Sequence, residues 1–211
     1  MWKVQLFELN YDEREVEAVA DVVRSGWITM GPKTSEFEDA FGRQLDGHRC
    51  TAVSSGTAAL HLAILALDLE PGDEVIVPAL TFVADANVVR MAGAIPVFAD
   101  CESIDNWNVG VESIRERITG RTRAVICVHY AGYACRMNEL RDLCDENALA
   151  LSRTSRTRPA GPTEIDRWER SVTSAVSASS PTRTYRWVKE EWSPLVMRIW
   201  MLVSVFSGHT A

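Results

Sequence analysis

Paired cysteines, long apolar runs and a surplus of positive charge are all lacking from this chain of 211 residues. Its five cysteines include no Cys-x-x-Cys pair, which argues against a metal site or a disulfide framework and predicts free thiols in the cytoplasm. The apolar segment 194–206 is interrupted by Arg198 and is shorter than the roughly 20 residues of a membrane-spanning helix. The net charge of −7 argues against nucleic acid or an anionic membrane as the main partner.

The amino-acid composition changes near residue 150. Residues 1–150 hold 13 Lys and Arg against 24 Asp and Glu, whereas residues 151–211 hold 9 against 5. Ser, Thr and Arg together account for 24 of the first 150 residues and for 25 of the last 61. Two different compositions are therefore joined at this point, and each part needs its own explanation.

Helical and strand patterns alternate through the acidic part. Apolar residues spaced three or four apart predict helices, and short apolar runs between turn residues predict strands. We expect strands at 50–54, 74–77, 95–99 and 124–128, and helices at 11–25, 35–47, 57–69, 81–91, 112–118 and 137–147. This alternation indicates an α/β fold with a mostly parallel sheet that is covered on both faces. Ligands of such sheets bind at the edge where the parallel strands end.

Residues 54–60, Ser-Ser-Gly-Thr-Ala-Ala-Leu, join a predicted strand to a predicted helix. Free backbone N–H groups of Gly56 and Thr57 at the start of that helix would form an anion seat suited to phosphate, and the hydroxyl of Ser55 or Thr57 could add a hydrogen bond. The segment matches neither the Walker pattern nor Gly-x-Gly-x-x-Gly. An ordinary N-cap serine followed by a turn glycine explains it equally well.

Phe82 follows another predicted strand and is expected at the same edge as the anion seat. Its aromatic face could stack on a planar ring whose phosphate occupies that seat, although position alone favours a core residue. His129 also follows a predicted strand. It either lines the same pocket or is a hydrogen-bonded structural histidine, and His61, among core residues of a helix, is interpreted as structural.

Three segments resemble one protein family in order and spacing. They are residues 54–63 (SSGTAALHLA), 71–84 (PGDEVIVPALTFVA) and 93–100 (GAIPVFAD), preceded by 25–32 (SGWITMGP). Together they resemble the DegT/DnrJ/EryC1/StrS family of pyridoxal-phosphate-dependent sugar aminotransferases. The likeness runs from about residue 8 to residue 151.

The resemblance implies a three-layer α/β fold of the aspartate-aminotransferase type (PLP fold type I), present here only to about residue 151. It implies pyridoxal 5'-phosphate (PLP) as the cofactor, with Ser55, Gly56 and Thr57 at its phosphate and Phe82 against its ring. The family's substrates are nucleotide-linked keto sugars, and glutamate is the expected amino donor. The intact enzymes are homodimers with active sites between the subunits.

Three functional elements of the family are missing after residue 151. They are an acid for the pyridine nitrogen in a segment such as I-E-D-x-A-H, a serine near the phosphate, and the lysine that binds the cofactor covalently in a segment such as N-K-N-L. Residues 152–159 read SRTSRTRP instead, and Lys189, the only lysine of the tail, lies in a segment that does not match. We therefore predict a truncated homologue without transaminase activity and no catalytic residue of its own.

The sequence leaves two other functions open. A non-catalytic binding or assembly partner of an intact paralogue is the alternative, since active sites of the family lie between subunits. A flavodoxin-like module for a phosphorylated ligand would leave the ordered motifs unexplained. Because some relatives replace the lysine and carry out dehydration, the parent reaction is either transamination or dehydration.

The tail resembles a family gene read out of frame. Codons for residues 152–158 can be chosen so that a start one base earlier encodes I-E-D-V-A-H-A, and codons for 182–192 so that it encodes N-K-N-L-P-V-G-E-G-G-M. We predict that residues 1–151 are the N-terminal part of the PLP-dependent transferase large domain and that 152–211 are an aberrant, poorly structured tail. Without a selected binary pattern, residues 152–186 are expected to form no packed element.

Overall fold

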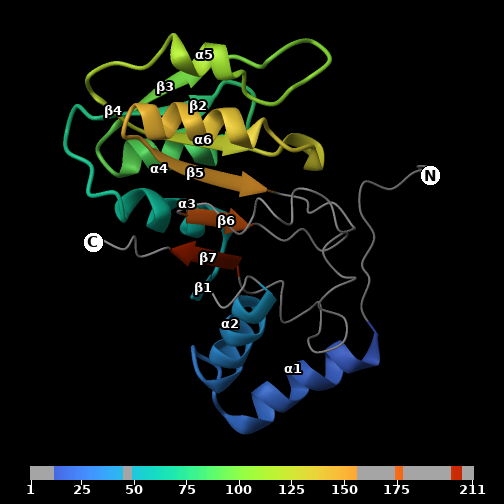
Figure 1. The fold of residues 1–211 in the computed structure, drawn as a ribbon. Helices are drawn as coiled ribbons and strands as arrows, with labels where there is room; N and C mark the ends of the chain where they lie inside the picture. Colours follow the sequence, from blue (N-terminus) through green and yellow to red (C-terminus); the bar gives the residue numbers. More distant parts are fainter. Residues whose placement is uncertain (1–11, 45–48, 156–173, 178–200, 206–211) are drawn as a thin grey trace.

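The structure, a computed structural model, describes residues 12–44, 49–155, 174–177 and 201–205. Its strands form one seven-stranded sheet in the order β1-β7-β6-β5-β4-β2-β3 (Figure 1). The strands are β1 (Cys50–Val53), β2 (Glu74–Pro78), β3 (Ile95–Ala99), β4 (Thr122–Val128), β5 (Ala150–Ser155), β6 (Ser174–Ser177) and β7 (Met201–Val205). The helices are α1 (Glu13–Ser25), α2 (Pro32–Gln44), α3 (Gly56–Leu65), α4 (Ala84–Met91), α5 (Val111–Arg115) and α6 (Met137–Glu146), with a 3₁₀ turn at Tyr130–Gly132.

Strand direction brings six strand ends to one edge of the sheet. β2 is parallel to β3 and β4, β4 to β5, and β5 to β6. β7 is antiparallel to both β6 and β1, so β1 runs in the same direction as β2 to β6. The edge at which these six strands end is here named the carboxyl edge, and it is where ligands bind in sheets of this kind.

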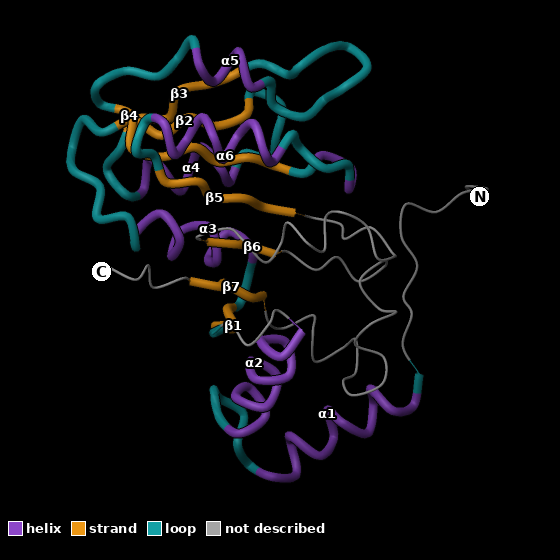
Figure 2. The backbone as a smooth tube through the Cα atoms, viewed as in Figure 1, coloured by secondary structure: helices purple, strands orange, loops and turns teal. Residues whose placement is uncertain are grey.

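Helices lie on both faces of the sheet (Figure 2), and each face carries its own apolar core beneath them. Val75 and Val77 of β2 belong to the core under α3 and α4, whereas Ile76 between them belongs to the core under α5 and α6. In β4, Ile126 belongs to the core under α3 and α4, and Val125 belongs to the core under α5 and α6. This alternation follows from the two-residue period of a strand, and it gives a helix–sheet–helix sandwich.

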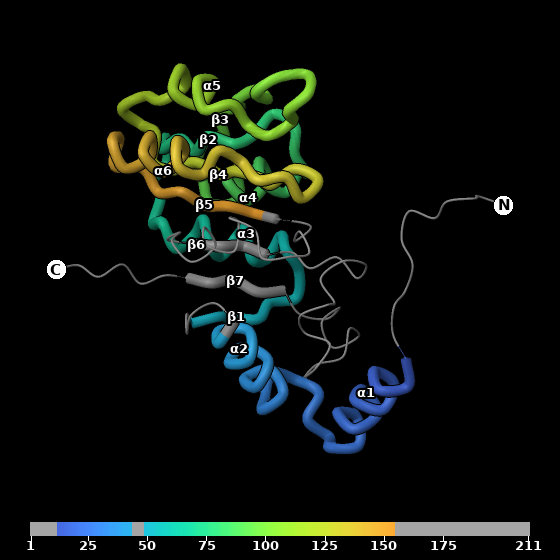
Figure 3. The backbone as a smooth tube through the Cα atoms, turned by 45° about the vertical axis from the view of Figure 1, so that its right-hand side comes forward, coloured from blue at the N-terminus to red at the C-terminus, as the bar shows by residue number. Residues whose placement is uncertain are grey.

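α1 and α2 lie at the β1 end of the sheet, away from α5 and α6 (Figure 3). α2 is tied to the sheet by Glu38, whose Oε1 accepts a hydrogen bond from the backbone N–H of Ala52 in β1 at 2.8 Å. α1 begins with a capping box, in which Asp12 accepts from the helix and Glu15 accepts from the N–H of Asp12. Gly26 ends the helix with φ of 73°, a conformation that favours glycine.

The predicted fold class, a three-layer α/β structure with a mostly parallel sheet, is confirmed. One expectation about the tail is wrong in part. The strand β5 continues through Ser155, and residues 174–177 form β6 beside it, so segments of 152–186 do join the sheet. The segments 156–173 and 178–186 lie outside the described residues, and the domain boundary near residue 151 stays a prediction.

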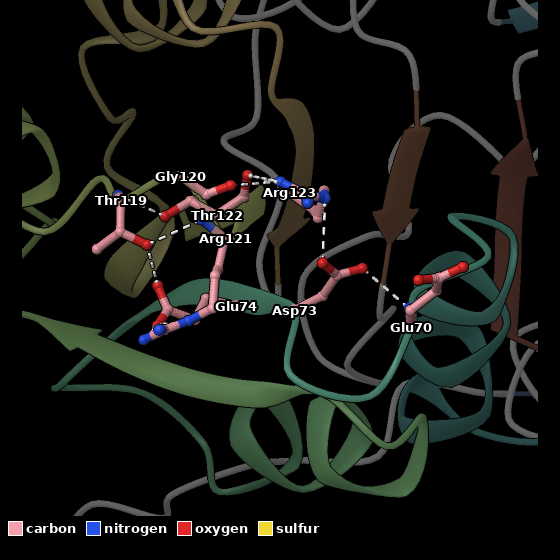
Figure 4. Close-up of polar contacts among 8 residues, drawn as sticks. All are labelled: Glu70, Asp73, Glu74, Thr119, Gly120, Arg121, Thr122 and Arg123. Atoms are coloured by element: carbon pink, nitrogen blue, oxygen red, sulfur yellow. Dashed lines mark hydrogen bonds and ion pairs between the residues drawn. The ribbon is translucent and has the colours of Figure 1, made fainter.

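A polar cluster fixes the opposite edge of the sheet, where β2 and β4 begin (Figure 4). The buried Glu74 carboxylate accepts hydrogen bonds from Thr119 Oγ1 at 2.6 Å and from Arg121 Nε at 3.0 Å. These bonds lower the pKa of the Glu74 carboxyl. The pairing of β2 with β4 shifts register after Glu74, and Arg123 beside this shift pairs with Asp73 at 3.1 Å. The cluster therefore holds the strand starts in register.

Replacement of Glu74 by Gln is expected to lower the free energy of unfolding by about 1–3 kcal/mol at neutral pH, because a buried carboxylate that accepts from Thr119 and Arg121 loses its charge. The folded-state pKa of Glu74 lies below its unfolded value. Its contribution is therefore present above the unfolded pKa and is lost as the pH falls through the folded pKa. Urea unfolding across this acid range should show the two proteins converge. The exposed Glu112→Gln is the control, and a gap independent of pH would contradict the prediction.

Candidate functional site

The segment between β1 and α3 forms an open helix N-terminus at the carboxyl edge. Ser55 is the N-cap in extended conformation, and its Oγ accepts from the N–H of Ala58 at 3.1 Å. Its carbonyl accepts from the N–H of Ala59 at 3.0 Å. Gly56 and Thr57 begin the helix, and within the described ranges their N–H groups have no hydrogen-bond partner.

The segment shows both the N-cap serine and the open helix N-terminus that were expected from its sequence. The serine is an N-cap, and two adjacent amides beyond it remain available at the positive end of the helix dipole. An exposed Thr57 hydroxyl stands beside them. Such an arrangement binds a phosphate or another oxyanion. The assignment of Ser55, Gly56 and Thr57 to a cofactor stays a prediction.

Phe82 lies in the turn between β2 and α4, and 70% of its surface is exposed. The alternative that it is a core residue is therefore wrong. The predicted helix 81–91 begins only at Ala84, which leaves residues 79–83 as a turn at the carboxyl edge. An exposed aromatic face in this place is available to stack on a planar ligand.

Asp85 holds this turn, a role that sequence analysis did not find. Thr81 Oγ1 donates a hydrogen bond to Asp85 Oδ2, and the backbone N–H of Asp85 donates to the carbonyl of Phe82 at 3.1 Å. The side chain is almost entirely buried, and burial raises the pKa of its carboxyl. A single polar residue inside an apolar helical pattern leaves no periodic signal from which this role could have been predicted.

Packing of α3 against α4 brings the two candidate elements together. Both helices follow strands of the same direction, so both begin at the carboxyl edge. They share one apolar core, in which Ala59 and Ala63 of α3 and Val88 of α4 are fully or almost fully buried. The open amides of Gly56 and Thr57 and the exposed ring of Phe82 consequently belong to the same side of the sheet.

His129, at the end of β4, is buried and bonded within the chain. Its backbone N–H donates to the carbonyl of Thr154 at 3.1 Å, and its Nδ1 accepts from the N–H of Cys135 at 3.2 Å. The bond at Nδ1 requires that nitrogen to be unprotonated. These contacts support the structural interpretation of His129 over a role as pocket lining. His61 on α3 is half-buried.

In the part of the chain that the structure describes, no three or more His, Cys, Asp or Glu side chains gather in a way that could hold a metal ion. Nor does any helix within those ranges have the length and apolar character needed to cross a membrane. All five cysteines are free thiols.

The fold is that of the PLP-dependent sugar aminotransferases of known structure. NtdA from Bacillus subtilis, solved with the cofactor PMP bound, matches with a TM-score of 0.74 over 99% of this chain and 47% of its own, at 22% identity. Among curated proteins, GDP-perosamine synthase of Vibrio cholerae is 42% identical over 149 residues. UDP-4-amino-4-deoxy-L-arabinose–oxoglutarate aminotransferase of Shewanella sediminis is 45% identical over 132 residues.

The family model of the DegT/DnrJ/EryC1/StrS aminotransferases matches residues 10–153, and the chain belongs to this family. The resemblance noted in the sequence is thereby confirmed. The two alignments cover 70% and 63% of this chain but only 40% and 34% of the respective relatives. The chain thus spans well under half the length of the curated relatives it matches.

Proposed function

We propose that the chain is a truncated homologue of a PLP-dependent aminotransferase that acts on nucleotide-linked keto sugars with glutamate as amino donor. In this proposal Ser55, Gly56 and Thr57 hold the phosphate of PLP and Phe82 stacks on its pyridine ring. The observation that carries it is the pairing of two open amides with an exposed aromatic ring at one edge. PLP would supply an electron sink to the substrate when bound.

The residues that are present fit only part of the cofactor. The α3 N-terminus suits a phosphate and Phe82 suits a ring, but the end of β5 offers no carboxylate for the ring nitrogen. Ser152, Arg153 and Thr154 stand there, where the family segment I-E-D would begin. The chain also lacks the family's lysine segment. We therefore propose that it retains a cofactor cradle but does not transaminate.

The composition of β5 supports the proposed change of reading frame at about residue 151. Ser152, Arg153 and Thr154 are buried on a strand that pairs with β4 on one side and β6 on the other. Within the described residues Ser152 Oγ is buried without a hydrogen-bond partner. Burial of the Ser152 hydroxyl without a partner is costly, and a run of Ser, Arg and Thr in this position is unlike a selected strand pattern.

The proposal is tested by equilibrium binding of PLP, pyridoxal and inorganic phosphate. PLP should bind about tenfold more tightly than pyridoxal, since one charge-assisted contact contributes about 1.5 kcal/mol or more. Gly56→Glu should abolish this preference, because it places a negative charge at the seat. Ala66→Glu, at the other end of α3, is the matched control. Equal affinity of PLP and pyridoxal for the unaltered chain would refute the anion seat.

The proposed role of Phe82 is tested by comparing the ligand affinities of two alanine variants. Phe82→Ala should weaken PLP about tenfold and leave inorganic phosphate unchanged, because only the ring contact is lost. Phe98→Ala removes an exposed aromatic ring from β3 and should change neither affinity. An equal loss in both variants would indicate general destabilisation.

A non-catalytic assembly partner remains the alternative function. Val23, Trp27, Ile28 and Met30, at the end of α1 and before α2, are all more than half exposed. An apolar surface of this kind suits association with another protein chain, either a homodimer or an intact paralogue. Co-purification with a full-length homologue, lost in Ile28→Asp, would favour this function. A cytoplasmic location is proposed from the free thiols.

A further inference from the structure

Asn108 connects two neighbouring loops of the carboxyl edge. It lies in the loop between β3 and α5, and only 3% of the residue is exposed. The segment that it contacts, residues 130–134, follows β4. β4 pairs directly with β2, the strand that leads into the Phe82 turn, so this segment and the Phe82 turn follow neighbouring strands at the carboxyl edge.

The Asn108 amide uses both of its functional groups on that segment. Its Oδ1 accepts from the N–H of Tyr130 at 2.9 Å. Its Nδ2 donates to the carbonyl of Tyr133 at 3.2 Å and to that of Ala134 at 2.9 Å. One side chain thus holds both ends of the five-residue segment. No other natural side chain of this length offers a neutral acceptor and two donors.

The conformation that Asn108 holds is a costly one. Ala131 has φ of 51° and ψ of 19°, a left-handed conformation that is unfavourable for alanine, and Gly132 follows with φ of 87°. Such a turn persists only where its surroundings determine it. Trp107, next to Asn108, adds an edge-on ring contact with Tyr130 at 5.4 Å between centroids.

We propose that Asn108 is a positioning residue that fixes residues 130–134 in a single conformation and so preforms the side of the ligand site next to Phe82. Without it the segment would populate other conformations, and a ligand would have to order the segment on binding. The contacts of Asn108 stand by themselves, whereas the effect on PLP rests on the proposed function.

Hydrogen exchange of the full chain tests the contacts. In Asn108→Ala the amide of Tyr130, which loses its acceptor, should exchange about tenfold faster, as expected for loss of a net hydrogen bond. The amide of Tyr133 should also exchange faster, because its hydrogen bond to the carbonyl of Tyr130 at 2.9 Å closes the turn that Asn108 holds. The amides of Val125 and Ile126 in β4 should keep their rates. In Asn108→Asp, which retains the acceptor but not the donors, the Tyr130 amide should stay more protected than that of Tyr133. This variant also carries the test if the alanine variant fails to fold.

Asn147→Ala is the matched control. It removes an amide that donates to the carbonyl of Leu143, four residues earlier, at the end of α6. It should leave exchange at Tyr130 and Tyr133 unchanged. Unaltered rates in both Asn108 variants, or equal acceleration of all amides, would overturn the positioning role.

Ligand binding separates this inference from the proposed function. Asn108→Ala should weaken PLP about tenfold and leave the affinity for inorganic phosphate unchanged, because the seat at α3 is not altered. Equal weakening of both ligands would speak against a positioning role. If the unaltered chain binds neither ligand, the proposed function fails, and the exchange pattern alone decides the role of Asn108.

Discussion

Borohydride reduction of the chain after mixing with PLP is expected to label no single lysine to completion. Stoichiometric labelling requires an amine held beside the carbonyl carbon of the cofactor. The sequence has three lysines, Lys3, Lys33 and Lys189, and none lies in the family's lysine segment. Lys33 is exposed on α2 and pairs with Glu36 at 2.8 Å. Peptide mapping by mass spectrometry would measure the labelled fraction of each lysine.

A frame-restored version of the same gene provides the control. With one base added back near codon 151, the tail should encode a lysine in an N-K-N-L segment, and that lysine alone should be labelled. Coding DNA that continues in frame through residue 151 into a tail shared by intact relatives would remove the basis of this expectation. So would complete labelling of Lys189 in the present chain.

Much of the sheet could be predicted because the strands of the acidic part are short apolar runs bounded by turn residues. β3 begins and ends where the pattern placed it, and β2 extends one residue further, to Pro78. The predicted ends of the helices were less accurate than those of the strands. α3 stops at Leu65 rather than at residue 69, since the apolar residues after it pack from a turn and not from a helix.

β6 and the part of β5 beyond residue 151 could not be predicted, because their sequences carry no pattern that specifies a strand. Residues 152–155 and 174–177 are rich in Ser, Thr and Arg, yet they pair through backbone hydrogen bonds, which are indifferent to side chains. Their place in the sheet is set by the parallel strands beside them.

Some residues of the candidate site could likewise be predicted from the sequence, and others could not. Gly56, Thr57 and Phe82 could be singled out because each sits next to a strand end, where local sequence and topology agree. Asp85 and Asn108 could not. Asp85 acts through a bond with Thr81 in the turn before its own helix, and Asn108 acts through contacts with another loop. A buried polar residue in a loop has no sequence signature apart from its partners.

Replacement of Ile126 by Ala is expected to lower the free energy of unfolding by about 2–5 kcal/mol, a large part of the stability of an ordinary domain. Ile126 is fully buried in β4 and packs in the core under α3 and α4. Its loss leaves a cavity between the sheet and the helix that begins at Gly56. Urea unfolding followed by circular dichroism would measure the change.

Two further substitutions make the result specific. Ile104→Ala removes the same atoms from a side chain that is 87% exposed and should change stability by less than about 0.5 kcal/mol. Leu140→Ala, in the core on the opposite face, should cost as much as Ile126→Ala, and the two losses should add because the two side chains belong to separate cores. A small loss for both core variants would mean that the acidic part has no independent core. Without such a core, the amides of Gly56 and Thr57 would not be held beside Phe82, and the cofactor cradle could not form.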